Sequence, residues 1–329
     1  MKLFSLVQTL KEKEILFPSN PEISGLTYDS RQIRPGCLFA AIKGTAVDGH
    51  RFLKEAVEKK AAALLVERPL ENCSTPQIIV HNTRKALAEC ADVFYGHPAE
   101  KLKLIGVTGT NGKTTTTYLC DSIFSQAGFK TGIIGTIQYK IGDRIQKCKN
   151  TTPESLDLYQ MFTEMVESGV DACSMEVSSH ALDQGRVHGI LFDTVVFTNL
   201  TQDHLDYHKT MEAYFEAKSK LFTEILPNKN PKAVINSDDP YGQRLLRKVK
   251  IPCLTYGIHQ GEVRAKELSL EWKGVSFTVL SPIGEFKTHL AISGKFNVYN
   301  ALAAISTGIA LNIPIETIQK GIETAEQVR

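Results

Sequence analysis

From about residue 102 onward, hydrophobic and polar positions follow one repeated pattern along the chain. Short apolar runs alternate with longer segments in which apolar residues recur every three or four positions. The short runs are typical of buried strands, and the longer spacing is typical of amphipathic helices. This alternation predicts an α/β fold with a doubly wound, mostly parallel sheet. The expected strands are 102–107, 131–134, 171–177, 192–197, 232–235 and 253–256, and the expected helices are 114–126, 154–167, 211–225 and 240–248.

The ends of the chain follow different patterns. Residues 262–291 show short alternating runs, which predict a small antiparallel element, and two helices are expected after it, at 296–311 and 315–324. Residues 1–100 predict a smaller α/β unit that ends where Gly96 and Pro98 break its last helix. Its expected strands are 23–28, 37–42, 62–66 and 77–80, and its expected helices are 52–59 and 83–95. We therefore predict two domains, 1–100 and 101–329.

The larger domain begins with an apolar strand, a glycine-rich turn and a polar helix start, Leu104 to Thr117. Glycines let backbone N–H groups surround a phosphate, and the helix directs its free N–H groups at the same anion. Lys113 can reach the outer phosphates, and the Thr114 hydroxyl can hold Mg²⁺. The usual phosphate loop has a glycine where Val107 stands, and Gly106 is one residue too early. The alternative interpretation is a glycine turn between a strand and an ordinary helix.

Polar clusters also follow two other predicted strands, at 176–180 and 198–206. Because ligands of open α/β sheets bind beyond the carboxyl ends of the strands, we expect the three polar turns to meet around the phosphates. Glu176 is then an Mg²⁺ ligand or a base, or otherwise a solvated turn residue. His204 is a metal ligand or a capped surface histidine, although Mg²⁺ prefers oxygen ligands.

Some polar residues have an ordinary structural interpretation. Lys218 and Lys220 lie on a predicted amphipathic helix, and a solvated helix face accounts for both of them. Thr152 is a plausible N-cap, and Pro153 a plausible first residue, of the helix predicted at 154–167.

Composition restricts the class of protein. Hydrophobic residues make up 42% and charged residues 22% of the 329 positions, as in ordinary globular proteins. A net charge of +2 gives no reason to expect nucleic acid or an anionic membrane as a partner. The seven cysteines are scattered and form no CxxC pair, which favours reduced thiols in a cytoplasmic protein. No apolar run approaches membrane-spanning length, so membrane insertion is not expected.

The combined motifs resemble the ATP-dependent Mur ligases, which build the stem peptide of peptidoglycan. The matching segments are Gly106–Thr115, Met175–His180, Thr198–His208, Glu216–Lys218, Asn236–Asp239 and Gly294–Asn300. Asn150–Thr152 and Glu176–His180 resemble the branch that adds the third residue to UDP-N-acetylmuramoyl-L-alanyl-D-glutamate. Tyr28–Arg31 and Gly36–Ala41 resemble its uridine-binding module, so domain 1–100 is expected to bind the UDP-sugar.

The resemblance implies a role for each matching residue. ATP would be bound by Gly109, Thr110, Asn111, Gly112, Lys113, Thr114, Thr115 and Asn297. Mg²⁺ would be held by Thr114, Glu176, His204 and Lys218, the last carrying a carbamate derived from CO₂. The UDP-sugar peptide would contact Tyr28, Ser30, Thr45, Ala46, Val47, Asn150, Thr151, Thr152, Ser178, Gln184 and Arg186. The catalytic set would be Lys113, Glu176, His204 and Lys218.

The implied reaction is amide formation through an acyl phosphate. The resemblance favours meso-diaminopimelate over L-lysine as the incoming amino acid. The resemblance also implies a cytoplasmic monomer. The family carries a further C-terminal Rossmann-like domain, and this chain ends about where that domain begins. We therefore expect a truncated form that binds its substrates and is inactive alone.

Three other functions stay open on the sequence. They are the D-alanyl-D-alanine-adding ligase of the same pathway, a folylpolyglutamate synthetase, and a non-catalytic UDP-sugar or nucleotide-binding protein. Asn150–Thr152 and Glu176–His180 disfavour the first, and the uridine-type domain 1–100 disfavours the second. The end of the chain at Arg329 keeps the third open.

Overall fold

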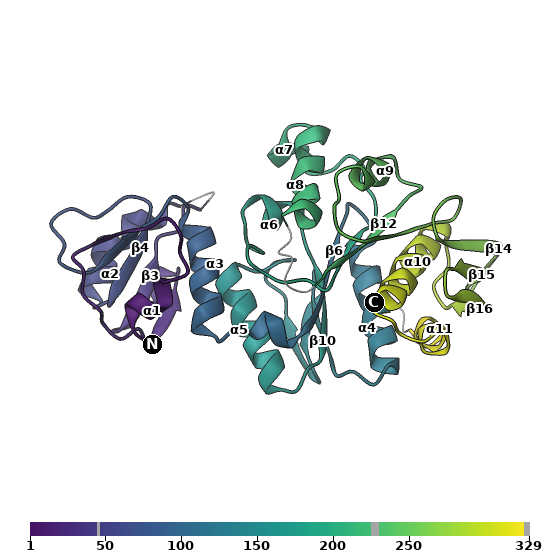
Figure 1. Cartoon of the computed structure of the whole chain (residues 1–329), viewed down its shortest axis with the longest axis horizontal. Coiled ribbons are helices and arrows are strands. Elements are labelled where there is room, and N and C mark those ends of the chain that lie inside the picture. The colour runs from purple at the N-terminus through teal and green to yellow at the C-terminus, as the bar shows by residue number, and fades with distance from the viewer. Residues whose placement is uncertain (45–46, 225–229, 326–329) are drawn as a thin grey trace. The chain divides into compact units, whose positions relative to one another are not determined.

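The chain folds into two compact units, which are seen in the computed structural model in Figure 1. The structure describes residues 1–44, 47–224 and 230–325. The first unit contains Met1–Pro98 and two later segments, Glu154–Thr163 and Gln184–Gly189, and the rest of the chain forms the second unit. The sequence analysis placed these two segments in the predicted domain 101–329 and not in the predicted domain 1–100.

The first unit is built on a five-stranded sheet of order β1-β5-β4-β3-β2, in which β1 is antiparallel and the other strands are parallel. Its strands are β1 (Glu14–Leu16), β2 (Gly25–Thr27), β3 (Cys37–Ala40), β4 (Ala63–Val66) and β5 (Gln77–Ile79). Its helices are α1 (Leu3–Val7), α2 (Leu53–Glu58) and α3 (Thr83–Phe94). All residues of β3 and β4 are buried, as expected for parallel strands covered on both faces. The strands and helices predicted at 23–95 are confirmed.

The second unit is built on an eleven-stranded sheet of order β16-β15-β14-β13-β12-β11-β6-β10-β7-β8-β9. Seven adjacent strands of this sheet, β14-β13-β12-β11-β6-β10-β7, run parallel to one another. Antiparallel strands flank them at both ends. The parallel strands are β6 (Lys103–Thr108), β7 (Thr131–Ile134), β10 (Ala172–Glu176), β11 (Thr194–Phe197), β12 (Lys232–Asn236), β13 (Cys253–Gly257) and β14 (Val263–Glu271). The mostly parallel sheet predicted from the sequence is confirmed.

Two antiparallel elements complete this sheet. The strands β15 (Gly274–Ser281) and β16 (Gly284–Leu290) extend β14 as the antiparallel element predicted at 262–291. The hairpin β8 (Gln138–Ile141) and β9 (Arg144–Lys147) at the other edge was not predicted. Its outer strand is mostly exposed, so it lacks the apolar run that identifies a buried strand.

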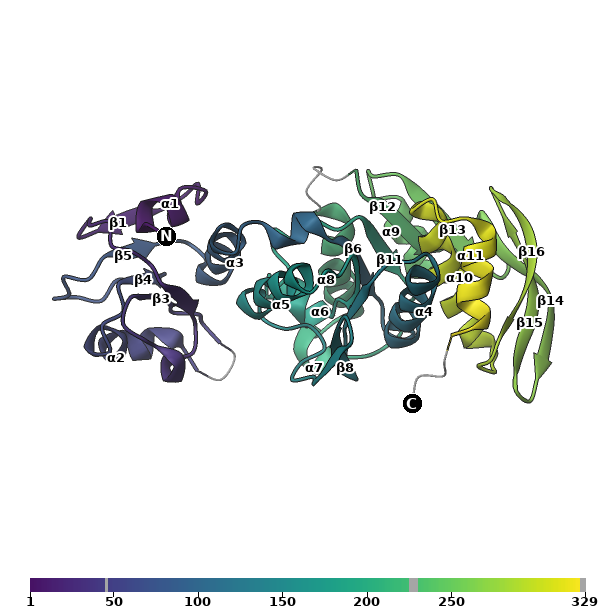
Figure 2. The same cartoon turned by 90° about the horizontal axis from the view of Figure 1, so that it is seen from below.

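Helices cover both faces of the larger sheet. They are α4 (Lys113–Gln126), α6 (Ser179–Asp183), α7 (Leu205–His208), α8 (Met211–Thr223), α9 (Pro240–Leu246), α10 (Lys295–Ala310) and α11 (Ile315–Glu323). The helix α5 (Ser155–Glu167) is divided between the two units, with its first nine residues in the first unit. Figure 2 shows α4, α10 and α11 side by side, and they share one core with Val196 of β11. The next residue, Phe197, points to the opposite face and contacts Phe222 of α8. The sheet is therefore doubly wound, as predicted.

None of the helices in the described part of the chain combines the length and apolar character needed to cross a membrane.

Candidate functional site

The glycine-rich turn lies between β6 and α4 and has the backbone conformation that only glycine adopts easily. Gly112 precedes the first residue of α4 with φ of +87°, in the left-handed region. A Cβ on Gly112 would lie 2.2 Å from Asn300 Oδ1, and a Cβ on Gly109 would lie 1.9 Å from Thr198 Oγ1. The two glycines are thus required by both conformation and close packing.

The turn after β11 holds the glycine-rich turn in place. Asn199 accepts hydrogen bonds from the Thr110 N–H (2.9 Å, through its carbonyl) and the Asn111 N–H (2.9 Å, through Oδ1). Thr198 Oγ1 donates to the Asn111 carbonyl at 2.6 Å. The loop is therefore fixed by a strand that neighbours β6 in the sheet.

Gly106 has a different structural role from Gly109 and Gly112 of the loop. It lies inside β6, and a Cβ there would come within 2.9 Å of the Phe192 ring. Its position one residue before the usual site in phosphate loops thus reflects packing against Phe192, and the loop itself depends on Gly109 and Gly112.

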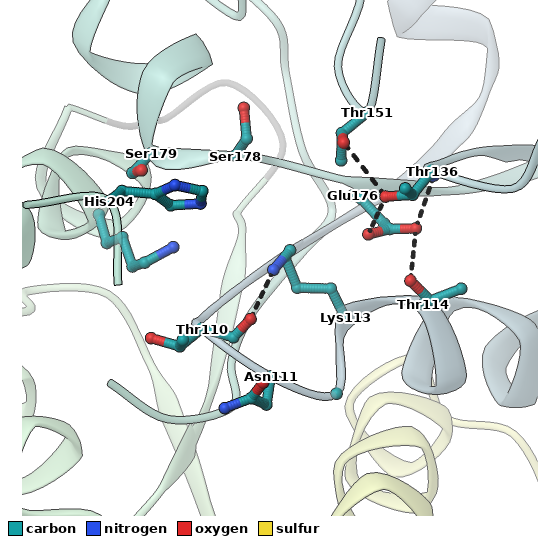
Figure 3. A pocket seen from close by; sticks show the side chains of 12 residues that line it. Thr110, Asn111, Lys113, Thr114, Thr136, Thr151, Glu176, Ser178, Ser179 and His204 are labelled. Atoms are coloured by element: carbon teal, nitrogen blue, oxygen red, sulfur yellow. Dashed lines mark hydrogen bonds between the residues drawn. The ribbon is translucent and has the colours of Figure 1, made fainter. Parts of the chain in front are cut away.

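A polar cavity of about 280 Å³ opens above the loop (Figure 3). It is lined by Thr110, Asn111, Gly112, Lys113, Thr114, Thr136, Thr151, Glu176, Ser178, Ser179, His204 and Lys218. Most of these residues come from the ends of β6, β7, β10 and β11 and from the turns and helix starts that follow them, while Thr151 precedes α5 and Lys218 lies in α8. The three polar turns therefore meet at one edge of the sheet, as the sequence predicted.

Glu176 ends β10 inside this cavity with 1% of its surface exposed. Its Oε1 accepts hydrogen bonds from Thr114 Oγ1 (2.9 Å) and from the Thr136 N–H (2.9 Å). Thr136 Oγ1 donates to its Oε2 at 3.1 Å. These contacts are drawn in Figure 3 and contradict the interpretation of Glu176 as a solvated turn residue.

The oxygens of Thr114 and Glu176 suit Mg²⁺, which prefers hard oxygen donors and often takes only one or two protein ligands beside substrate phosphates. Within the described residues, no group of three or more His, Cys, Asp or Glu side chains is arranged to hold a metal. A site built from one hydroxyl and one carboxylate is compatible with that mode of Mg²⁺ binding.

Lys113 and Lys218 bring two amino groups to the same loop carbonyl. Lys113 Nζ donates to the carbonyls of Gly109 (3.0 Å) and Thr110 (2.8 Å), and Lys218 Nζ donates to the Gly109 carbonyl at 2.7 Å. Burial lowers the pKa of Lys113, although the carboxylates of Glu176 and Asp203 act in the opposite direction.

Lys218 is 1% exposed, so the solvated helix face that the sequence allowed for it is wrong. Burial, and next the positive charge of Lys113, lower the pKa of Lys218 well below its ordinary value. Its Nζ also lies 4.7 Å from the centre of the Tyr214 ring. Lys220 keeps a partly exposed side chain and pairs with Asp183 at 3.0 Å, as its surface interpretation implies.

We expect Lys218→Met to raise the free energy of unfolding at neutral pH. The folded chain releases the Lys218 proton at a lower pH than the unfolded chain, whose lysine pKa is about 10.4. Between these two values the unfolded state binds more protons, so the stability of the wild type rises with pH. The substitution should remove this rise and, by replacing a buried ionisable group, stabilise by about 1–4 kcal/mol.

Urea unfolding in CO₂-free buffer at pH 7 and pH 10 measures this effect. Lys220→Met is the matched control, because the same substitution on the same helix removes a partly exposed lysine. Equal pH dependence in the wild type and in Lys218→Met would contradict the lowered pKa.

His204 lies at the rim of the polar cavity. It precedes α7 with φ of +50°, an uncommon conformation for a residue other than glycine. Its Nε2 is 3.5 Å from Asp203 Oδ2, and its ring meets that of His180 edge to face at 4.9 Å. His204 is thus held at the cavity that contains Glu176 and Lys218, and 45% of its side chain is exposed.

A second cavity, of about 570 Å³, shares Asn111 and Gly112 with the first. Its other lining residues are Thr198, Asn199, Thr201, Asn236, Asp238, Asp239, Pro240, Phe296, Tyr299 and Asn300. Asp238 accepts hydrogen bonds from the N–H groups of Ile258, His259 and Gln260 and from the Tyr299 hydroxyl. Burial alone would raise the pKa of Asp238, but these hydrogen bonds together outweigh it and lower the pKa. Asn297 reaches this cavity indirectly, since its Oδ1 accepts from Asn300 Nδ2 at 3.1 Å.

The expected substrate residues of the second unit gather near Glu176. Thr152 Oγ1 donates to the Glu176 carbonyl (2.8 Å) and accepts from the Ser178 N–H (3.0 Å). Thr151 Oγ1 is 3.1 Å from Thr136 Oγ1, and the Asn150 carbonyl accepts from the Tyr139 hydroxyl at 2.6 Å. The prediction of Thr152 as an N-cap is wrong, because the helix begins at Ser155 and the Thr152 hydroxyl joins the end of β10.

The other expected substrate residues belong to the first unit. Tyr28 donates its hydroxyl to Asp157 Oδ2 at 2.7 Å, and Gln184 Oε1 accepts from Arg186 Nη2 at 2.7 Å. The Ser30 carbonyl accepts from Lys59 Nζ at 2.9 Å, and Val47 is exposed. Thr45 and Ala46 lie outside the described residues.

Two groups of cavity residues were missed in the sequence. Thr136 follows β7 by two positions, so the rule that found Glu176 at the end of β10 would also have found Thr136. Phe296 and Tyr299 lie in the first turn and a half of α10, and only their side-chain directions reveal that they line the second cavity.

Two family descriptions match the chain. Residues 107–308, more than half of the chain, match the Mur ligase middle domain, and residues 22–95 match the Mur ligase family catalytic domain. A curated relative from Bacillus cereus, a UDP-N-acetylmuramoyl-L-alanyl-D-glutamate–2,6-diaminopimelate ligase, is 48% identical over 323 residues. That match covers 97% of this chain and 66% of the relative, so the chain spans about two thirds of the relative's length.

Solved structures show the same fold. A structure titled as a UDP-N-acetylmuramoyl-L-alanyl-D-glutamate–2,6-diaminopimelate ligase superposes with a TM-score of 0.82 at 26% identity, covering 93% of this chain and 63% of that one. A MurF ligase from Thermotoga maritima, solved in complex with ADP, has a TM-score of 0.63 at 19% identity, covering 92% of this chain and 66% of that one. The second likeness supports the fold alone.

Proposed function

This chain belongs to the Mur ligase family, and on that premise we propose that it serves ATP-dependent addition of the third amino acid to UDP-N-acetylmuramoyl-L-alanyl-D-glutamate. The cavity that unites the glycine-rich loop with Glu176, His204 and Lys218 carries this proposal. The product would be a precursor of peptidoglycan, made in the cytoplasm. Diaminopimelate is favoured over L-lysine as the incoming amino acid, because the similar curated relatives are named for it.

The loop residues Gly109 to Thr115 would bind the ATP phosphates through the loop N–H groups and Lys113. The second cavity, reached past Asn111 and Gly112, would hold the nucleoside. Thr114 and Glu176 would hold Mg²⁺, with His204 at the rim as a further candidate, and the ion would supply charge neutralisation at the phosphate oxygens.

In the reaction, an oxygen of the substrate carboxylate would form a bond to the γ-phosphorus while the bond to the ADP oxygen breaks. The neutral amine of the incoming amino acid would then form a bond to the carbonyl carbon of this acyl phosphate, the bond from that carbon to the phosphate oxygen would break, and the amine would give up one proton to the departing phosphate. Carboxylate and triphosphate repel each other, so positive charge placed in advance lowers the barrier. Lys113 would supply that charge at the outer phosphates.

Lys218 would act as a carbamate instead of an amine. A neutral amine reacts with CO₂, and the lowered pKa of Lys218 makes the neutral form accessible. The carbamate oxygens would be anionic donors at the cavity, which suit Mg²⁺ as an ammonium group does not.

The first unit would bind the UDP-sugar part of the substrate. Tyr28, Ser30 and Val47, together with Thr45 and Ala46, would contact the nucleotide-sugar, and Gln184 and Arg186 would contact the muramoyl peptide. In the second unit, Asn150, Thr151, Thr152 and Ser178 are proposed as further contacts of the substrate peptide.

Calorimetry with purified protein tests the proposal. We expect ADP with Mg²⁺ and UDP-N-acetylmuramoyl-L-alanyl-D-glutamate each to bind with one site per chain, and UDP-N-acetylglucosamine to bind more weakly. Tighter binding of the tripeptide nucleotide than of the dipeptide nucleotide would instead favour a D-alanyl-D-alanine-adding ligase. Binding of neither ligand would overturn the proposal.

A further inference from the structure

Three charged side chains from distant parts of the sequence form one cluster in the first unit. Arg84 Nη1 of α3 lies 2.5 Å from Glu154 Oε2, and Arg186 Nε lies 3.3 Å from Glu154 Oε1. The side chains of Arg84, Glu154 and Arg186 are only 12%, 16% and 17% exposed. One carboxylate is thus shared by two guanidinium groups in a partly desolvated place.

The cluster orients Arg186 from two sides. Gln184 Oε1 accepts hydrogen bonds from Arg186 Nε (3.0 Å) and Nη2 (2.7 Å), while Glu154 contacts the same guanidinium group. Glu154 in turn is held by Arg84, which donates to both of its oxygens. Arg186 is therefore held by Glu154, which Arg84 holds in turn.

The place of Arg84 in its helix is unfavourable by itself. Asn82 caps α3, so Arg84 lies in the first turn, where the helix dipole disfavours a cation. The pair with Glu154 offsets this cost.

The charge of Arg84 affects the electrostatic potential at Arg186. Removing Arg84 would take one positive charge away from beside the Glu154 carboxylate, which also contacts Arg186. In a site of low exposure such charges are weakly screened, so removing Arg84 lowers the positive potential at Arg186.

We propose that Arg84 is a positioning residue for substrate binding, which neutralises Glu154 so that Arg186 presents positive charge to an anionic group of the substrate. This inference rests on the proposed function and extends it to Arg84, which no motif singled out. The anionic group is either the diphosphate or a carboxylate of the muramoyl peptide.

Calorimetry of Arg84→Gln, Glu154→Gln and the double variant tests the inference. We expect Arg84→Gln to weaken binding of UDP-N-acetylmuramoyl-L-alanyl-D-glutamate by about 10- to 100-fold. The double variant should bind at least about 5-fold tighter than Arg84→Gln, because it no longer contains the carboxylate that offsets Arg186. Arg84→Lys, which keeps the charge, should lose less than Arg84→Gln. If Arg84 has only a structural role, the double variant should not regain affinity for the nucleotide.

Arg144→Gln is the matched control, because it breaks an exposed Arg–Glu pair with Glu164 in the other unit. ADP binding and the thermal unfolding midpoint monitor folding of each variant, and Arg84→Lys is compared with the wild type if Arg84→Gln unfolds. UDP alone identifies the anionic group: an equal loss for UDP assigns the diphosphate, and a loss confined to the peptide ligand assigns the carboxylate.

These measurements distinguish failure of the proposed function from failure of the proposed role of Arg84. A wild type that fails to bind the dipeptide nucleotide overturns the proposed function. A wild type that binds it, with Arg84→Gln as tight as Arg144→Gln, overturns only the role of Arg84. A double variant no tighter than Arg84→Gln overturns the charge mechanism.

Discussion

Substitution of Lys113 by alanine is expected to remove most of the affinity for ATP with Mg²⁺. The Lys113 amino group is held over the loop by the carbonyls of Gly109 and Thr110, in a cavity lined mostly by polar protein atoms. Removing one partner from a buried pair of charges costs about 2–5 kcal/mol. Affinity should therefore fall by about 30-fold to several thousand-fold at 25 °C.

Calorimetry on the folded variant measures this loss. Lys130→Ala provides the control, because the Lys130 side chain is 44% exposed and pairs weakly with Asp143. The thermal unfolding midpoint shows whether the variant keeps its fold. An unchanged affinity in a folded Lys113→Ala variant would show that the glycine-rich turn does not bind phosphate.

The sequence predicted the sheet of the second unit because its strands are apolar runs bounded by turns. β7 was found with its observed bounds, Thr131–Ile134, and β10 and β11 were found within one or two residues. The hairpin β8–β9 was missed for the opposite reason, since three of the four residues of β9 are exposed and polar or charged side chains dominate it. A strand at the edge of a sheet needs no apolar run.

The polar turns were predictable because of a rule of topology. Parallel strands end at the same edge, so the residues after β6, β10 and β11 had to approach one another once those strands were neighbours. The burial of Lys218 was not predictable in this way. An amphipathic helix shows which residues share a face, whereas the depth of Lys218 depends on the loop carbonyl of Gly109, more than a hundred residues earlier in the chain.

Long-range contacts also explain the other differences between the sequence-based predictions and the structure. Thr152 has the residue type and spacing of an N-cap, but its hydroxyl bonds to the Glu176 carbonyl, and that partner cannot be read from local spacing. The return of Glu154–Thr163 and Gln184–Gly189 to the first unit is of the same kind. The pairing of Arg84 with Glu154 joins positions 70 residues apart and becomes visible only in the folded structure.

Lys218 is expected to carry a carbamate at neutral pH in the presence of bicarbonate. The Nζ lone pair would form a bond to the carbon of CO₂, one C=O electron pair would move to oxygen, and the displaced N–H proton would pass to solvent. The positive charge of Lys113, which lowers the pKa of Lys218, also stabilises the resulting anion. Burial disfavours both charged forms, so the Lys113 charge decides in favour of the carbamate over the ammonium.

A protein sample in ¹³C-bicarbonate should show one carbamate carbon signal by NMR, and Lys218→Arg should lack it. Lys220→Arg is the control, because Lys220 is partly exposed and paired with Asp183. Since only the neutral amine reacts, the signal should grow as the pH rises, and Lys113→Ala should weaken it. Without the carbamate, Mg²⁺-dependent tightening of ATP binding should fall about 10- to 100-fold in Lys218→Arg, in line with the usual loss for residues that support a metal site. A carbamate signal that persists in Lys218→Arg, or an ammonium at Lys218 in ¹⁵N spectra at pH 8, would contradict this assignment and leave Lys218 as a buried hydrogen-bond donor to the loop.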